Sequence, residues 1–116
     1  MNAMQIEVTP LSDQGDARVA VVGDLNGESG KLARRQLARL VDSGAVNLMI
    51  DLDQVGTIDS GGLAALIVTL RRARDKGGDV RVRTSQPHIR RLMELTGLSR
   101  VFRMPAADRS ATEVAA

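Results

Sequence analysis

The feature that most constrains the fold of this chain is the spacing at which its apolar residues recur. Near the N-terminus every second residue is apolar, as in a strand, and later segments alternate between the spacing of a helix and that of a strand. Met4, Ile6 and Val8 alternate with polar residues, as is typical of a strand with one wet face. Residues 10–17 are rich in turn formers, and a short β-branched run follows at 19–22. This order predicts a β-hairpin, in which a turn joins two strands.

Three later segments carry apolar residues at the spacing of one helix face. The first helix is expected between a glycine-containing loop at 26–30 and the stop at Gly44. The second ends at a glycine pair at 77–78. The third starts at Pro87, which suits the first turn of a helix, and ends at Gly97.

Two further strands are expected between these helices. Residues 46–50 are an almost continuous apolar run, which favours a central strand that is covered on both faces and ends at Asp51. Val80 and Val82 alternate with arginines in the next strand, and residues 98–104 are compatible with a last short one. Because strands and helices alternate after the hairpin, we predict an α/β domain with a mixed sheet.

The chain has the size and composition of one domain. It has 116 residues, 43% of them hydrophobic, which is enough apolar material for one core. It contains no cysteine, so neither a disulfide nor a thiolate metal site is expected. No apolar run approaches the roughly 20 residues that span a bilayer, and the first residues do not resemble a secretion signal. We therefore expect a cytoplasmic protein that does not bind membranes.

The charges are nearly balanced, with 16 basic and 14 acidic residues and a formal net charge of +2. Most of the basic residues are arginines, and their spacing is typical of the solvent-exposed faces of three helices. These arginines are Arg34, Arg35, Arg39, Arg71, Arg72, Arg74, Arg90 and Arg91. Phe102 is the only aromatic residue, so the chain lacks a platform for stacking bases. Nucleic-acid binding is disfavoured, although contacts to phosphate alone stay open.

Two segments are similar to catalytic motifs but lack residues that those motifs need. Residues 58–62 are similar to a nucleophile elbow, yet Ile58 stands where the strained turn needs a glycine. The only histidine, His88, lies at an expected helix start, which is more typical of a surface side chain than of a catalytic base. Residues 27–32 are similar to a phosphate loop, but Leu32 replaces the serine or threonine after the lysine. We expect no enzyme activity.

The aspartates near the central strand do not form a recognisable metal site. Asp51 and Asp53 flank the expected end of this strand, and Asp59 lies farther along the chain. No second group of acids is placed to complete a coordination shell. We therefore expect neither a metal nor a cofactor.

Residues 57–63 link the central strand to the amphipathic helix that follows. Their chemistry favours a helix N-terminus at which Asp59 or Ser60 accepts hydrogen bonds from the free N–H groups of the first turn. Gly61 and Gly62 then allow a tight bend. The segment is also compatible with modification, because an exposed hydroxyl at a helix start can receive a phosphate without unfolding the helix.

Four stretches of the chain together carry a recognisable pattern. They are Gly-Asp-Leu-Asn at 23–26, Val-Gly-Thr-Ile-Asp-Ser-Gly-Gly-Leu at 55–63, the glycine pair at 77–78, and Ile-Arg-Arg-Leu-Met-Glu-Leu-Thr-Gly-Leu at 89–98. In this order they resemble the STAS domain and, within that family, the bacterial anti-sigma factor antagonists. The resemblance covers about residues 4–115. It implies a single STAS-like α/β domain over 1–116, with a core at 4–104 and a C-terminal helix or frayed tail at 105–116. It also implies a mixed sheet of four to five strands, with three to four helices packed mainly on one face.

The resemblance further implies a partner switch in transcription regulation, such as a stress response uses. In that family a partner that is both a serine kinase and an anti-sigma factor phosphorylates the serine after the motif aspartate, which is Ser60 here. The unphosphorylated antagonist binds this partner and frees a sigma factor, and phosphorylation abolishes binding. A PP2C-type phosphatase acts on the phosphorylated form, and the antagonist is a monomer or weak dimer. The implied partner-binding residues are Asp24, Asn26, Asp59, Ser60, Gly61, Gly62 and Leu63.

Two positions differ from the usual pattern of these antagonists. Gly61 stands where a serine or threonine usually follows the phosphorylated serine, and Asn26 stands where an aspartate is usual. The resemblance also allows a second role, that of a constitutive STAS adaptor in a transport or signalling complex. In that role Ser60 is only a helix cap, and the partner is different.

Overall fold

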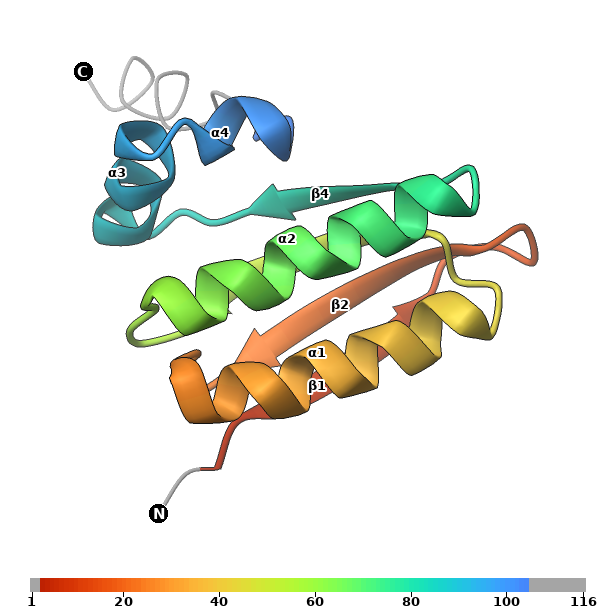
Figure 1. The fold of residues 1–116 in the computed structure, drawn as a ribbon, viewed down its shortest axis with the longest axis horizontal. Helices are drawn as coiled ribbons and strands as arrows, with labels where there is room; N and C mark the ends of the chain where they lie inside the picture. The colour runs from red at the N-terminus through yellow and green to blue at the C-terminus, as the bar shows by residue number, and fades with distance from the viewer. Residues whose placement is uncertain (1–2, 105–116) are drawn as a thin grey trace.

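Strands and helices alternate along the chain in the computed structural model, which describes residues 3–104 (Figure 1). The described strands are β1 (Gln5–Pro10), β2 (Asp16–Val22), β3 (Asn47–Gln54) and β4 (Asp79–Arg83). The described helices are α1 (Gly27–Asp42), α2 (Ser60–Asp75), α3 (Pro87–Leu95) and α4 (Leu98–Val101). None of these helices combines the length and the apolar composition needed to cross a bilayer.

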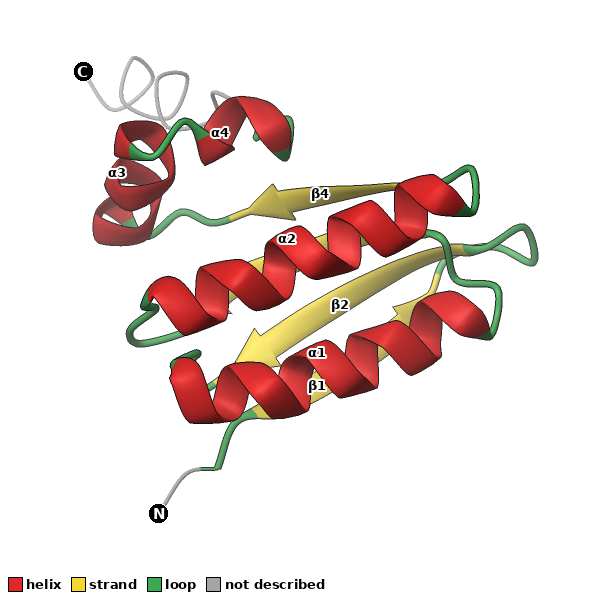
Figure 2. Ribbon diagram, in the orientation of Figure 1, coloured by secondary structure: helices red, strands yellow, loops and turns green. Residues whose placement is uncertain are grey.

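The described strands form one four-stranded mixed sheet in the order β1-β2-β3-β4. β1 and β2 pair antiparallel as the predicted hairpin, and β2, β3 and β4 run parallel. Both parallel steps go in the same direction across the sheet, so right-handed crossovers place both connecting helices on one face. Figure 2 shows α1 and α2 lying side by side along the strands, with α3 and α4 beside β4. The predicted α/β class is confirmed, with four strands in this part of the chain.

The core lies between the sheet and the paired helices. Alternate side chains of the strands point into it and pack against the apolar stripes of α1 and α2. Its fully buried members include Val19, Val21, Leu37, Val41, Ile50, Leu52, Leu66 and Val82. Beyond β4 the core continues through Ile89, Met93 and Phe102, which α3 and the C-terminal segment contribute.

β3 differs from the central strand that its apolar run predicted. The strand continues through Asp51 to Gln54, so Asp51 lies inside it and does not end it. The strand is also not covered by apolar groups on both faces. On the face away from the helices Asp51 pairs with Arg18, whose side chain is 51% exposed. A charged residue is tolerated in the middle of the sheet because arginines on the neighbouring strands pair with it.

α1 begins inside the segment that was predicted to be a loop at 26–30. Asn26 is its N-cap and accepts hydrogen bonds from the N–H groups of Glu28 and Ser29, both at 3.0 Å. Ser29 Oγ in turn accepts a bond from Asn26 N–H at 2.9 Å. This capping box gives partners to the free N–H groups at the helix start, which offsets the low helix propensity of the glycines there.

The prediction of a last strand at 98–104 is wrong. The segment instead forms α4, which follows Gly97 with its positive φ of 77°. Phe102 is 0% exposed, and its carbonyl accepts one hydrogen bond from Val82 N–H at 3.3 Å. Burial of this aromatic ring holds the segment against β4 without the ladder of bonds that a strand would need.

One arginine that was predicted to lie on a wet helix face is buried. Arg90 in α3 is 9% exposed, and its Nη1 lies 3.5 Å from Thr84 O. α3 packs against the end of the sheet, so its inner side includes this position as well as Ile89 and Met93. The other arginines of the three predicted wet faces are exposed. The predicted helix or tail at 105–116 lies outside the described residues.

Candidate functional site

The residues predicted to bind a partner lie together at one edge of the sheet. The segments after β2 and β3 leave the carboxyl ends of parallel strands and pair through a bridge between Leu25 and Ile58. Leu25 N–H donates to Thr57 O at 2.9 Å, and Asp59 N–H donates to Leu25 O at 3.2 Å. α1 and α2 start just after these segments, so their N-termini lie next to each other (Figure 1).

Asp59 is the N-cap of α2, which decides between Asp59 and Ser60 as the capping residue. Asp59 Oδ1 accepts hydrogen bonds from the N–H groups of Gly61 at 2.9 Å and Gly62 at 3.2 Å. Asp59 Oδ2 accepts a third bond, at 3.2 Å, from Gly27 N–H in the first turn of α1. One carboxylate therefore caps α2 and joins the N-termini of the two helices.

Asp24 and Asn26 hold the backbone on the α1 side of this edge. Asp24 Oδ1 accepts a hydrogen bond from Thr57 N–H, in the segment after β3, at 3.1 Å. The Asn26 amide oxygen caps α1, which an aspartate carboxylate at the same position would also do. The departure from the family pattern at Asn26 thus keeps the helix cap and removes one negative charge.

Gly61 and Gly62 lie where the two helix N-termini pack backbone to backbone. A Cβ on Gly61 would lie 2.4 Å from Gly27 Cα, and a Cβ on Gly62 would lie 2.1 Å from Leu25 O. From the α1 side, a Cβ on Gly30 would lie 2.7 Å from Gly61 O. Because the crowding atoms belong to the backbone, they cannot rotate away. Gly61, where the resemblance leads us to expect a serine or threonine, therefore belongs to this helix contact.

Gln86, which no motif singled out, and His88, which was considered only as a catalytic base, hold the loop in front of α2. Gln86 Nε2 donates to carbonyl groups at the end of β3, namely Asp53 O at 2.8 Å and Val55 O at 2.6 Å. The His88 ring nitrogen Nε2 lies 2.9 Å from Gly56 O. His88 lies at the start of α3, as expected, but its contact with the loop has no sequence signal because the two segments are far apart in the chain.

Ser60 is the first residue of α2, and its side chain is exposed. Within residues 3–104 its hydroxyl makes no hydrogen bond. Leu63, one turn along the helix, is half-buried. Since the loop before α2 is held from the sides of both α1 and α3, this edge presents a neutral hydroxyl on a fixed backbone. Such a group can contact another protein or accept a transferred group.

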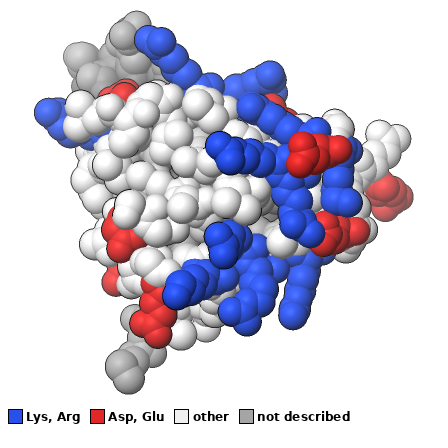
Figure 3. Space-filling model, in the orientation of Figure 1, with Lys and Arg blue, Asp and Glu red and all other residues white. Residues whose placement is uncertain are grey.

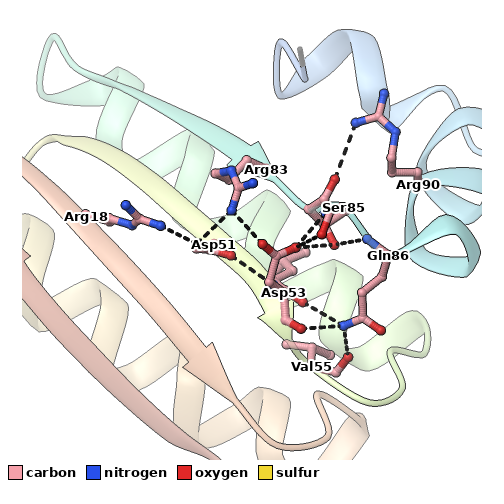
Figure 4. Close-up of polar contacts among 10 residues, drawn as sticks. Arg18, Asp51, Asp53, Val55, Arg83, Ser85, Gln86 and Arg90 are labelled. Atoms are coloured by element: carbon pink, nitrogen blue, oxygen red, sulfur yellow. Dashed lines mark hydrogen bonds and ion pairs between the residues drawn. The ribbon is translucent and has the colours of Figure 1, made fainter. Parts of the chain in front are cut away.

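A second polar cluster lies on the sheet face away from the helices (Figure 4). Asp51 Oδ2 accepts hydrogen bonds from Arg18 Nη2 at 2.6 Å and Arg83 Nη1 at 3.0 Å. Arg83 Nη1 also donates to Asp53 Oδ2 at 2.6 Å. Asp53 Oδ1 accepts from Ser85 N–H at 2.6 Å. The cluster therefore joins three neighbouring strands to the segment that leads into α3.

These surroundings lower the pKa of both carboxyl groups. Burial by itself raises the pKa of Asp51, but the Asp53 N–H and the guanidinium groups of Arg18 and Arg83 outweigh it, so the pKa lies below its ordinary value. Burial also acts against ionisation of Asp53, and there the Ser85 N–H and the Arg83 guanidinium lower the pKa. In the described part of the chain no group of three histidine, cysteine or acidic side chains is placed to hold a metal ion.

Comparison with protein families agrees with this architecture. The family model of the STAS domain matches residues 10–112, which is most of the chain. The chain belongs to the STAS domain family. Among curated proteins, this STAS domain is 28% identical over 103 residues to the anti-sigma-B factor antagonist of Bacillus subtilis (strain 168), an alignment that covers 89% of this chain and 94% of the relative.

Solved structures share the fold of this STAS domain. An anti-sigma factor antagonist from Mycobacterium paratuberculosis matches it with a TM-score of 0.75 and 26% identity, over 97% of this chain and 95% of the other. The Bacillus cell fate determinant SpoIIAA in its phosphorylated form matches with a TM-score of 0.65 and 14% identity, over 97% of this chain and 99% of the other. The likeness to SpoIIAA shows the fold alone, because the identity is low.

Charge is unevenly distributed over the face of the STAS domain on which α1 and α2 lie. Figure 3 shows lysine and arginine side chains gathered over the middle and C-terminal parts of these helices, while the surface at their N-terminal ends is mostly uncharged. The acidic residues Asp24, Glu28 and Asp59 near that end are exposed. Ser60 therefore lies in neutral to acidic surroundings.

Proposed function

We propose that this STAS domain is an anti-sigma factor antagonist, a binding protein controlled by phosphorylation and not an enzyme. The unmodified form binds, in the cytoplasm, an anti-sigma factor that is also a serine kinase, and a sigma factor is released. The observation that carries the proposal is the Ser60 hydroxyl, which is exposed and makes no hydrogen bond within residues 3–104. The printed names of the relatives, anti-sigma factor antagonists, support the role.

The proposed partner-binding surface is the edge at which the two helix N-termini meet. Its residues are Asp24, Asn26, Asp59, Ser60, Gly61, Gly62 and Leu63. The caps of α1 and α2 and the contacts of Gln86 and His88 hold this edge in one arrangement. Binding then needs little ordering of the loop, which lowers its entropic cost.

Phosphorylation of Ser60 would add about 1.5 to 2 negative charges at this edge. The N–H groups of Gly61 and Gly62 already donate to Asp59, so they are not free to bind the phosphate. The helix dipole stabilises the new charge by only about 0.3 to 1 kcal/mol. The phosphate therefore stays outside, next to the Asp59 carboxylate, where the fold tolerates it and an approaching protein meets it.

The same charge acts strongly on the complex. A surface that fits a neutral hydroxyl would have to bury an unpaired dianion, which costs several kcal/mol. Because about 1.4 kcal/mol changes affinity tenfold, a loss of about a hundredfold or more follows. In this scheme the kinase supplies the ATP chemistry, the chain supplies the acceptor hydroxyl, and a PP2C-type phosphatase restores the binding form.

The direct test is to recover the binding partner with and without ATP and to map the modified residue by mass spectrometry. We expect a kinase-type anti-sigma factor that is held without ATP, is released with ATP, and phosphorylates Ser60. Ser60→Ala is expected to bind and stay bound in ATP, because no phosphate can form. Ser60→Asp is expected to bind about tenfold or more weakly, since one buried charge costs at least about 1.4 kcal/mol.

Ser99→Asp is the matched control, because Ser99 lies on α4, outside the proposed surface, and within residues 3–104 its hydroxyl also makes no hydrogen bond. It adds the same charge far from Ser60 and is expected to bind like the unmodified protein. Modification at another residue, or a partner that binds Ser60→Asp normally, would contradict the switch. A transport or signalling component recovered in the same way with Ser60→Asp would instead indicate the constitutive adaptor role.

A further inference from the structure

The outer sides of α1 and α2 carry a group of cationic side chains without acidic partners, which we call the basic face. Its members are Lys31, Arg34, Arg35, Arg39 and Arg71, and all of them are exposed. Within residues 3–104 none of the five forms an ion pair, whereas the nearby Arg72 binds Asp42 and Arg74 binds Asp79. In Figure 3 this region is mostly blue, with few acidic side chains between the cations.

The spacing of the cations on α1 works against the helix when it is alone. Lys31, Arg35 and Arg39 follow one another at intervals of four residues, so neighbouring cations lie one above the other on the same helix face. Like charges at this spacing destabilise a helix. Negative groups brought by a binding partner would reduce this repulsion, and within residues 3–104 no acidic side chain forms an ion pair with these three cations.

The basic face also has the shape to receive an acidic side chain. A shallow hollow of about 330 Å³ lies between the two helices. It is lined by Lys31, Arg34, Arg35, Ala38, Val68 and Arg72. The small apolar residues leave room for the stem of a glutamate or aspartate, and guanidinium groups at the rim suit carboxylate oxygens.

Arg72 already shows how a carboxylate binds at this hollow. Its Nε and Nη2 donate to the two oxygens of Asp42 at 2.9 Å and 2.7 Å, a bidentate pair. A protein surface is favoured over nucleic acid because the only aromatic side chain, Phe102, is fully buried and cannot stack on bases. It is favoured over a membrane because Ala38 and Val68, at the hollow, are small, and Leu32 is the single large apolar side chain that the described helices α1 and α2 expose, which is too little to insert into lipid.

One partner can reach both Ser60 and the basic face. Ser60 starts α2 and Arg71 lies near its end, which puts them about 16 Å apart along the helix at a rise of about 1.5 Å per residue. A protein interface of ordinary size covers about 800 Å² on each partner and is therefore about 30 Å wide. A protein that sits on Ser60 and extends along α1 and α2 thus meets the cations.

We propose that the basic face binds an acidic surface segment of the same protein partner that contacts Ser60. The inference rests on the proposed function and adds the chemistry of the partner. The cations attract the partner from a distance and align it along the helices, which mainly raises the association rate. An acidic partner surface also repels a phosphate on Ser60, so one charge pattern serves both binding and release.

The test compares two double variants that each remove two positive charges. Arg34→Gln/Arg35→Gln removes cations of the basic face, and Arg91→Gln/Arg100→Gln removes exposed arginines of α3 and α4. Association with the recovered anti-sigma factor is followed by stopped-flow fluorescence over a range of salt concentrations. We expect the first variant to associate about tenfold more slowly at low salt and to show a weaker salt dependence, and the second to stay within about twofold of the parent.

Two further measurements, the unfolding temperature of the variants and their response to ATP, distinguish an unfolded variant, a wrong basic-face proposal and a wrong proposed function. Arg34→Gln/Arg35→Gln is expected to unfold at the same or a higher temperature, because it relieves repulsion, so a slower association does not reflect unfolding. Equal slowing of both double variants would show that only net charge matters and would overturn the proposal. If no partner responds to ATP through Ser60, the proposed function fails, whatever the basic face does.

Two further probes test the other anionic surfaces. A short DNA duplex and phosphatidylcholine vesicles containing phosphatidylglycerol are titrated with the same variants. We expect only weak binding to either probe, equally reduced by the two double variants. Strong binding that only Arg34→Gln/Arg35→Gln abolishes, together with unchanged association with the protein partner, would assign the basic face to nucleic acid or lipid and overturn the proposal.

Discussion

Two pairs of aspartates hold the structure together at different places and with different partners. Asp24 and Asp59, in the loops before the helices, accept hydrogen bonds from backbone N–H groups. Asp51 and Asp53, in β3, are bound by arginines as well as by backbone N–H groups. Within residues 3–104 neither member of the first pair forms an ion pair.

The two pairs differ in where their negative charge acts. The sheet-face pair is neutralised by arginines, so its charge is used inside the domain. Asp24 and Asp59, near Ser60, bind backbone N–H groups, which carry no net charge. Their own negative charges therefore stay uncompensated by cations within residues 3–104. In the proposed switch, a phosphate on Ser60 would gain no cation from the capping network and would act on the protein bound at this surface.

The largest loss of unfolding free energy is expected from a substitution at the contact between the two helix N-termini. Gly62→Ala would place a Cβ 2.1 Å from Leu25 O, so the backbone must move apart, at a cost of about 3 kcal/mol of unfolding free energy. Gly27→Ala is the matched control, because nothing lies within 4 Å of the added Cβ, and we expect a change below about 0.5 kcal/mol. Urea unfolding measures both, and an unchanged midpoint for Gly62→Ala would contradict the close contact.

A smaller effect is expected from removing one charge in each aspartate pair. Asp53→Asn loses its ion pair with Arg83 and weakens the bond from Ser85 N–H, and we expect a loss of about 2 kcal/mol. Asp59→Asn keeps an amide oxygen that caps α2 nearly as well and loses only the 3.2 Å bond from Gly27 N–H, so a loss of about 1 kcal/mol is expected. The same unfolding measurement checks the order of the two variants, and equal losses would remove the contrast between the pairs.

The smallest effect is expected on how the unfolding free energy changes when the pH is lowered. Asp51 and Asp53 have folded-state pKa values below their ordinary one, so the stabilisation they give is complete above the unfolded pKa of about 3.9 and is lost as the pH falls through the folded values. We expect a constant unfolding free energy from neutral pH to about pH 5 and a decline below it. Asp53→Asn should decline less steeply, and a parallel decline would indicate that other carboxyls dominate.

Local patterns predicted most of the elements because their causes lie within a few residues. The hairpin, the three helix faces and the helix ends at Gly77 and Gly97 all follow from short-range spacing and turn chemistry. The start of α2 near Ser60 was also predicted from the residues around it. The start of α1 was placed too late, because the pairing of Asn26 with Ser29 was not recognised as a capping box.

The errors at the sheet and at the C-terminus have tertiary causes. Asp51 was taken as the end of a strand because the apolar run stops there. The strand continues through it because Arg18 and Arg83, on the neighbouring strands, pair with its carboxylate. The burial of Arg90 follows from how α3 packs. The helical turn at 98–101 depends on the burial of Phe102 in the core.

The amino-acid sequence alone determined the alternation of strands and helices, the mixed sheet and the position of a serine at a helix N-terminus. These follow from the spacing of apolar residues and from turn residues, which act over a few neighbouring positions. Only the tertiary structure decided that Gly61 and Gly62 serve a contact between two helix N-termini. It also decided that Gln86 and His88 hold the loop before Ser60 and that the unpaired cations of α1 and α2 form one face. Each of these depends on the distance between atoms whose residues lie far apart in the chain, which a linear pattern does not contain.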